Sequence, residues 1–219
     1  MEIIRDAGSL ILNFYYLALV ILMVLYRKYL GKHIGIIIIA MIITFLTESV
    51  GSAVKFTEGT MNTLPLFVVS ILGIVYFLFL FYFYRMMQNH QLKKFQMLLM
   101  LLHVLNFGGS LIFKKDFFSS FPEYTNFTSI FLILISLFIF LHDTFNSNKV
   151  LYIKGYFPFF VAVSLTFIYV GLVPILFFSN RIVTEVEMFT FYMMLFIINF
   201  FGYSIMLAGI FFARFQKKT

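Results

Sequence analysis

LPLFVVSILGIVYFLFLFYFYRM, residues 64–86, decides the fold of this chain. The stretch is apolar almost throughout, and its proline falls in the first turn of a helix, where a missing N–H costs nothing. An arginine stands near its far end. A hydrocarbon core of roughly 30 Å needs about 20 helical residues to cross it. Residues 64–86 therefore predict a membrane-spanning helix.

Six further apolar runs lie on either side of this stretch. They cover about Ser9–Tyr26, Ile34–Val54, Phe95–Phe113, Phe127–Leu141, Tyr156–Phe178 and Val186–Phe212. Hydrophobic residues make up 62% of the chain and charged residues 11%, and a water-soluble fold of this size could not bury so much apolar surface. The strands of membrane barrels alternate apolar and polar residues, unlike these runs. The sequence thus predicts an all-α, polytopic membrane protein with seven transmembrane helices in one domain, residues 1–219.

The charged residues between the runs predict an orientation. Eleven of the 16 basic residues lie in the gaps after the first, third and fifth runs and in the C-terminal tail. Eight of the nine acidic residues lie on the other side, and only Asp143 shares the basic side. Basic loops stay in the cytoplasm, so we expect the N-terminus outside and the C-terminus inside a bacterial cytoplasmic (inner) membrane. Seven crossings satisfy that arrangement. Anionic lipid headgroups account for the net charge of +7, and no nucleic-acid partner is expected.

A weak internal repeat is visible when the chain is shifted by 122 residues. Thr44-Phe45 then meets Thr166-Phe167, and Arg27 meets Lys149. The pattern favours a repeat that relates residues 1–90 to residues 127–212. Two three-helix units joined by one odd helix would share the same orientation in the membrane, as a parallel repeat requires. Chance similarity between apolar helices is the alternative.

Polar residues inside the runs are the candidates for a functional site. Burying an ionisable group in a bilayer is costly, so such residues usually face the interior of a helix bundle. Those whose spacing indicates one common interior, most of them at depths in its outer half, would bind a ligand or sense a proton. They are Glu48, Asn13, Lys55, His103, Asn106 and Asn199.

Each candidate also has a purely structural interpretation. Glu48 and Lys55 lie seven residues apart on one helical face, so an ion pair between them would serve packing alone. Asparagines inside membranes tie helices together through hydrogen bonds worth about 1 kcal/mol each. His103 needs only one donor and one acceptor to be satisfied. His142 and Asp143 are interpreted as a helix stop at the membrane interface.

Several known chemistries are excluded by what the chain lacks. It has no cysteine, so it forms neither a disulfide nor a thiolate metal site. The last run has no central lysine for a retinal Schiff base. The histidines of the chain do not follow the spacing of a zinc hydrolase. No phosphate-binding or dinucleotide-binding motif occurs in the sequence. We therefore expect no metal, no cofactor and no enzymatic activity.

The segments FLTESVG (residues 45–51), LPLF (64–67) and FYFYR (81–85) resemble uncharacterised seven-helix bacterial membrane proteins. The resemblance covers the second and third runs only. Some proteins of that class are thought to be partners of sensor kinases that lack an input domain of their own. The resemblance therefore implies a sensor or accessory role, and it carries no catalytic residue.

These observations predict a non-enzymatic membrane protein of sensor or receptor type. A polar cavity around Glu48 would bias helix packing, and the basic cytoplasmic loops would pass the signal to a protein partner, with the lipid bilayer as the surrounding medium. Two alternatives remain open. The chain could be a small solute transporter or channel with a repeat of three, one and three helices, or it could be a structural subunit of a membrane complex.

Overall fold

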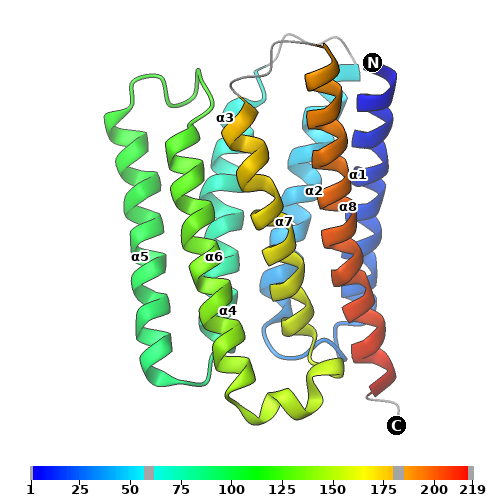
Figure 1. Cartoon of the computed structure of the whole chain (residues 1–219), viewed down its shortest axis with the longest axis vertical. Coiled ribbons are helices and arrows are strands. Elements are labelled where there is room, and N and C mark those ends of the chain that lie inside the picture. The colour runs from blue at the N-terminus through cyan, green and yellow to red at the C-terminus, as the bar shows by residue number, and fades with distance from the viewer. Residues whose placement is uncertain (1, 57–61, 180–184, 217–219) are drawn as a thin grey trace. The chain divides into compact units, whose positions relative to one another are not determined.

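The computed structural model describes the backbone of residues 2–56, 62–179 and 185–216, and the side chains of residues 8–54, 62–177 and 189–215. All regular elements within these ranges are helices (Figure 1). The described helices include seven segments that are long and apolar enough to cross a membrane. The predicted all-helical class and the seven long apolar runs are therefore confirmed.

The helices agree closely with the predicted runs. They are α1 (Glu2–Leu25), α2 (Ile34–Phe56), the continuous helix α3–η1–α4 (Leu64–Phe67, Val68–Val75 and Tyr76–Met86), α5 (His90–Phe113), α6 (Glu123–Phe145), η2 (Asn148–Gly155), α7 (Phe157–Ser179) and α8 (Glu185–Gln216). Pro65 lies in the first turn of α3, as predicted. Asn89 caps α5, because its side-chain oxygen accepts a hydrogen bond from the Gln91 amide at 2.8 Å. A polar side chain thus sets the start of α5.

Two compact units make up the chain, and the first comprises α1, α7 and α8 (residues 1–30 and 152–219). Within it α1 and α8 run parallel, and α7 runs antiparallel to α8 (Figure 1). Glycine allows α7 and α8 to pack closely. A Cβ atom added at Gly171 would lie 2.8 Å from Ile198, and Ser164 donates a hydrogen bond to the Gly202 carbonyl at 2.7 Å. Small residues serve this purpose widely in membrane proteins.

The second unit comprises α2, α3–η1–α4, α5 and α6 (residues 31–151). The helix α3–η1–α4 is its centre, since α2, α5 and α6 all contact it. Leu72, Leu80 and Phe83 are fully buried there, and the rings of Phe83 and Phe140 lie 4.9 Å apart. We call the end with Arg85 and the α4–α5 loop the basic end of unit 2. The repeat that would relate residues 1–90 to 127–212 stays a prediction.

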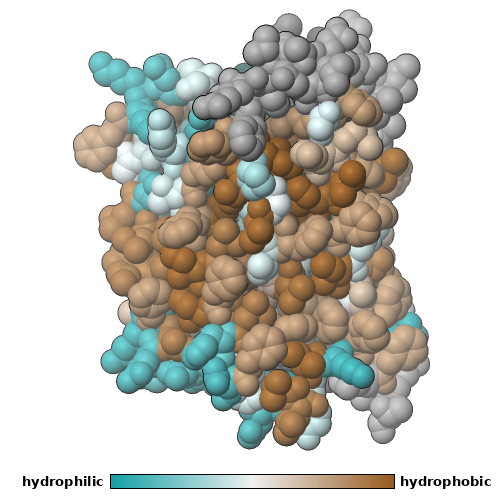
Figure 2. Space-filling model, viewed as in Figure 1, coloured by the Kyte–Doolittle hydropathy of each residue, from teal (hydrophilic) through white to brown (hydrophobic). Residues whose placement is uncertain are grey.

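The exposed surface of helix α5 suggests a lipid environment. Its buried residues are Gln96, Leu99 and His103, whereas Leu101 and Leu105 are more than half exposed. Figure 2 shows the same trend, with hydrophobic surface along the middle of the helices and hydrophilic residues gathered at their ends. A water-soluble fold would place these side chains the other way round. A multi-pass membrane protein accounts for the arrangement.

Candidate functional site

A line of polar side chains joins α5 to α6 inside unit 2. Near the end of unit 2 opposite its basic end, the hydroxyl oxygens of Ser110 and Thr125 are 2.7 Å apart. Asn106 donates from Nδ2 to Ser129 Oγ at 3.1 Å and to the carbonyl of Thr125 at 3.0 Å. Spacings of four and seven residues put these groups on facing sides of the two helices. We call this line, with Gln96, His103 and Ser136 described below, the polar seam.

Gln96 continues the seam toward the basic end. Its Nε2 donates to Ser136 Oγ at 2.6 Å and to the Leu80 carbonyl at 2.9 Å, so one amide joins α4, α5 and α6. Both side chains are fully buried. The Gln96 Oε1 atom is buried and has no hydrogen-bond partner among the described residues. Buried polar atoms nearly always have a hydrogen-bond partner. This oxygen can therefore accept a hydrogen bond from a further donor.

His103 connects the seam to the central helix. The side chain is 1% exposed, and its Nε2 lies 3.4 Å from the carbonyl oxygen of Gly73. In the tautomer that carries the proton on Nε2, this nitrogen donates to that carbonyl. Nδ1 then accepts, and it has no partner within the described part of the chain. His103 and Gln96 are thus two buried acceptors on the same face of α5.

The central helix departs from α-helical geometry where His103 meets it. Val68–Val75 (η1) is a π-helix of eight residues, and the amide of Tyr76 bonds back to the Ile71 carbonyl, five residues earlier. Tyr76 also donates from its hydroxyl to Asn126 Oδ1 at 3.2 Å, which ties this segment to α6. Such π segments are rare, and they are frequently found at functional sites. Because α2 also contacts η1, the segment is a junction of four helices.

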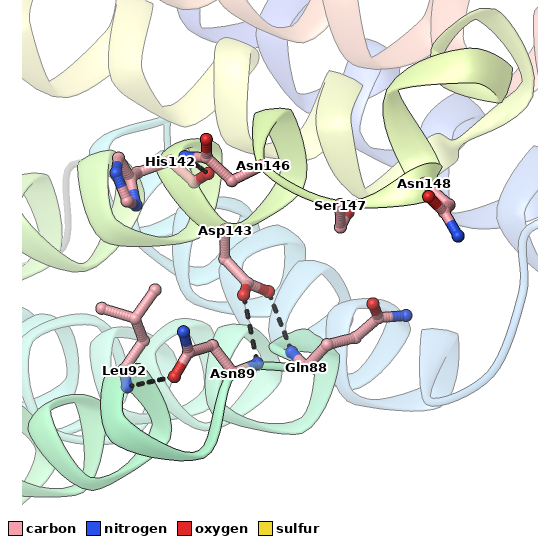
Figure 3. Close-up of a pocket in the computed structure, with 8 residues that line it drawn as sticks. All are labelled: Gln88, Asn89, Leu92, His142, Asp143, Asn146, Ser147 and Asn148. Atoms are coloured by element: carbon pink, nitrogen blue, oxygen red, sulfur yellow. Dashed lines mark hydrogen bonds between the residues drawn. The ribbon is translucent and has the colours of Figure 1, made fainter.

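At the basic end, Asp143 holds the loop that joins α4 to α5. Its Oδ2 accepts a hydrogen bond from the Gln88 amide at 2.8 Å, and its Oδ1 accepts one from the Asn89 amide at 3.1 Å (Figure 3). The carboxylate is only 5% exposed. We call this arrangement the Asp143 clamp. It satisfies two amides that precede α5, and hydrogen bonds to a charged acceptor are stronger than neutral ones.

A polar pocket of about 450 Å³ lies beside the clamp. Figure 3 shows α6 and the residues after it on one side and the α4–α5 loop on the other. Its lining consists of Gln88, Asn89, Leu92, His142, Asp143, Asn146, Ser147 and Asn148. Lys149, the next residue in the chain, donates from Nζ to the Met86 carbonyl at 2.8 Å. Burial lowers the pKa of Lys149, Asp143 acts against that lowering, and Lys93 adds to it.

No family model, curated protein or solved structure matches this chain. The site must therefore be interpreted from its own residues. Among those described, no group of three or more His, Asp or Glu side chains is placed to hold a metal ion. The seam consists mainly of hydroxyl and amide groups paired with each other. These groups can donate and accept hydrogen bonds.

The structure brings two of the six predicted site residues together in the seam, His103 and Asn106. Glu48 is half-buried on α2, which contacts η1 and α4, and the side chain of Lys55 lies outside the described residues. Asn13 and Asn199 belong to unit 1, where Asn199 donates to the carbonyl of Leu195 in its own helix at 2.8 Å. The common cavity of all six stays a prediction.

Sequence reasoning missed the role of Asp143. It was expected only to stop a helix, although α6 continues to Phe145 and the carboxylate binds the α4–α5 loop. One signal was available, because Asp143 is the single acidic residue on the basic side of the chain. An isolated carboxylate among basic loops needs donors, and backbone amides at a helix start supply them.

Proposed function

We propose that this chain is a non-enzymatic sensor or receptor of a bacterial cytoplasmic membrane that passes a signal to a protein partner. Its N-terminus lies outside, and its basic loops and C-terminus lie in the cytoplasm. The observation that carries the proposal is the polar seam, which reaches from Ser110 and Thr125 to Gln96 and Ser136 and contacts the π segment through His103. Chains of packed side chains and hydrogen bonds that have two arrangements can carry coupling between distant sites.

The π segment supplies the element with two states. One extra residue per turn can be lost or moved along the helix, and a shift of one residue rotates the following side chains by about 100°. The bond from His103 to the Gly73 carbonyl favours the present register. Glu48 lies on α2, which packs against the same segment. A ligand or proton that changes the charge of Glu48 would therefore alter the register and move α4.

Movement of α4 would reach the cytoplasm through the Asp143 clamp. The carboxylate joins the loop after α4 to the end of α6, and η2 follows directly. Within unit 2, Val150 and Leu151 are exposed here, Leu151 by 75%. Exposed apolar side chains beside basic loops fit a protein partner. We place the docking surface for that partner on residues 148–151 of unit 2.

Hydrogen–deuterium exchange in nanodiscs tests the proposal. We expect Glu48→Gln to change exchange at residues 86–93 and 146–151, because α2 acts on α4 through η1. Ser49→Ala is the matched control on the next residue of α2, and it should leave both segments unchanged. Unchanged exchange at these segments in folded Glu48→Gln protein contradicts the proposed relay.

A transporter is the second candidate, and η1 is the observation in its favour. Segments of π-helix are frequent at functional sites, and a substrate site is one such function. This function predicts solute flux in proteoliposomes that Glu48→Ala abolishes, whereas a sensor gives none. A structural subunit, the third possibility, predicts stoichiometric copurification with fixed partners and no effect of Glu48→Gln on exchange at the basic end.

A further inference from the structure

Basic side chains from several elements meet at the basic end of unit 2. The charges of Arg85, Lys32 and Lys93 all act on His33, although they come from α4, the α1–α2 turn and α5. Lys93 lies over the ring of Tyr84, and Lys149 donates to the Met86 carbonyl at 2.8 Å, so both approach the turn of α4 that carries Arg85. Lys93 also interacts with Lys149 in η2. We call Lys32, His33, Arg85, Lys93 and Lys149 the basic cluster. Like charges repel, so such an arrangement is costly without an anion.

The protein itself supplies little negative charge to this cluster. Asp143 is the one acidic side chain at this end among the described residues; its charge acts on Lys149, and each of its oxygens also accepts a hydrogen bond from a backbone amide. Glu48 lies about 20 Å along α2 from His33, at 1.5 Å per residue. Asp116 and Glu123 belong to the opposite end of unit 2. The cluster therefore has a net positive charge that an external anion can neutralise.

The cluster lies at the boundary of an apolar surface. Lys93 sits over the ring of Tyr84 at 5.7 Å, and tyrosines of this kind mark the level of lipid headgroups. Directly beyond it on α5, Phe95 and Leu98 are exposed, and Leu102 continues the same stripe one turn further on. A free phosphate has no apolar part that could contact such a surface, whereas a phospholipid can place its acyl chain there. The apolar stripe thus favours a lipid as the source of the anion.

The polar pocket adjoins the cluster through the α4–α5 loop. Gln88 and Asn89 line it between Arg85 and Lys93 in the chain, and Asn146 and Ser147 line its other side (Figure 3). Amide and hydroxyl groups bind uncharged polyols, because they both donate and accept hydrogen bonds. The Asp143 carboxylate in the same pocket disfavours a second negative charge. The headgroup that fits carries one phosphate and free hydroxyl groups.

We propose that the basic end of unit 2 binds a phosphatidylglycerol-type phospholipid, with its phosphate on the basic cluster and its glycerol in the polar pocket. Each basic residue near a membrane surface strengthens the binding of an anionic headgroup about fivefold. Removing two of them should therefore weaken binding about 25-fold. The proposed lipid site does not depend on the sensor function, because it is inferred only from the charges of these residues and their positions.

Native mass spectrometry of the detergent-purified protein with added phosphatidylglycerol or phosphatidylcholine tests the proposal. We expect preferential retention of phosphatidylglycerol, reduced about 25-fold in Arg85→Gln/Lys93→Gln. The matched control Arg27→Gln/Lys28→Gln removes the same charge from unit 1 on the same predicted side of the membrane, and it should retain phosphatidylglycerol like wild type.

Two results overturn the proposal. Equal retention of the two lipids by wild type means that the cluster does not select an anionic headgroup. An equal loss in both double variants means that general surface charge, rather than the cluster, binds the lipid. The variant Asn146→Ala tests the pocket separately from the basic cluster. It should lower the preference for phosphatidylglycerol over phosphatidic acid and leave retention of phosphatidic acid unchanged. If that preference stays the same, the pocket does not bind the glycerol.

Discussion

The Asp143 clamp can be tested by removing its carboxylate. In Asp143→Ala, the Gln88 and Asn89 amides lose acceptors that now lie at 2.8 and 3.1 Å. A hydrogen bond to a charged group is worth about 1.5–3 kcal/mol. Both loop residues are exposed, so water can partly replace the carboxylate. We therefore expect a loss of about 2 kcal/mol in the free energy that keeps the loop closed.

Amide hydrogen exchange measures this loss at the two residues concerned. A change of about 2 kcal/mol corresponds to exchange roughly 30-fold faster at Gln88 and Asn89. His142→Ala is the matched control, because its side chain is exposed and neighbours Asp143 without holding the loop. If the two amides exchange at the wild-type rate in folded Asp143→Ala protein, the carboxylate does not hold the loop, and the reasoning is refuted.

Three further predictions concern packing, the seam and pH. Gly202→Ala should lower the thermal unfolding temperature, because the added Cβ meets Ile168 too closely, whereas Gly108→Ala should not, because nothing lies within 4 Å of its Cβ. Gln96→Leu should lower the free energy of unfolding by about 1 kcal/mol, because it removes two buried hydrogen bonds in a membrane; a denaturant titration measures this change. Burial and then neighbouring positive charges lower the pKa of His33, so the side chain is neutral at pH 7 and gains a proton as pH falls through that lowered pKa. Phosphatidylglycerol retention should accordingly rise in acid for wild type, and a His33→Gln variant that keeps the full rise contradicts this assignment.

The long helices could be predicted because hydropathy averages over many residues. The apolar run at residues 64–86 has the same limits as the observed helix. Helix ends were less predictable, since they depend on single polar contacts. The run expected at 127–141 extends from Glu123 to Phe145, because the polar residues at its ends find partners on other elements of unit 2.

The π segment gave no signal in the sequence. Val68–Val75 is apolar except for Ser70 and carries no proline, so its hydrogen-bond pattern depends on packing against neighbouring helices. Helical spacing did place His103 and Asn106 on one face, as the seam requires. It could not find their partners, since contact between α5 and α6 depends on tertiary structure. Asp143 was missed for the same reason, because the amide of Asn89 is 54 residues away.

The proposed function requires that lipid surrounds these helices and that α6 crosses the membrane. The chain has no cysteine, so a single introduced thiol can be labelled without background. Ser120→Cys and Asn148→Cys lie beyond the two ends of α6. In intact cells, a membrane-impermeant maleimide should label Ser120→Cys, and it should label Asn148→Cys only after the cells are permeabilised. Equal labelling of both variants in intact cells contradicts the account.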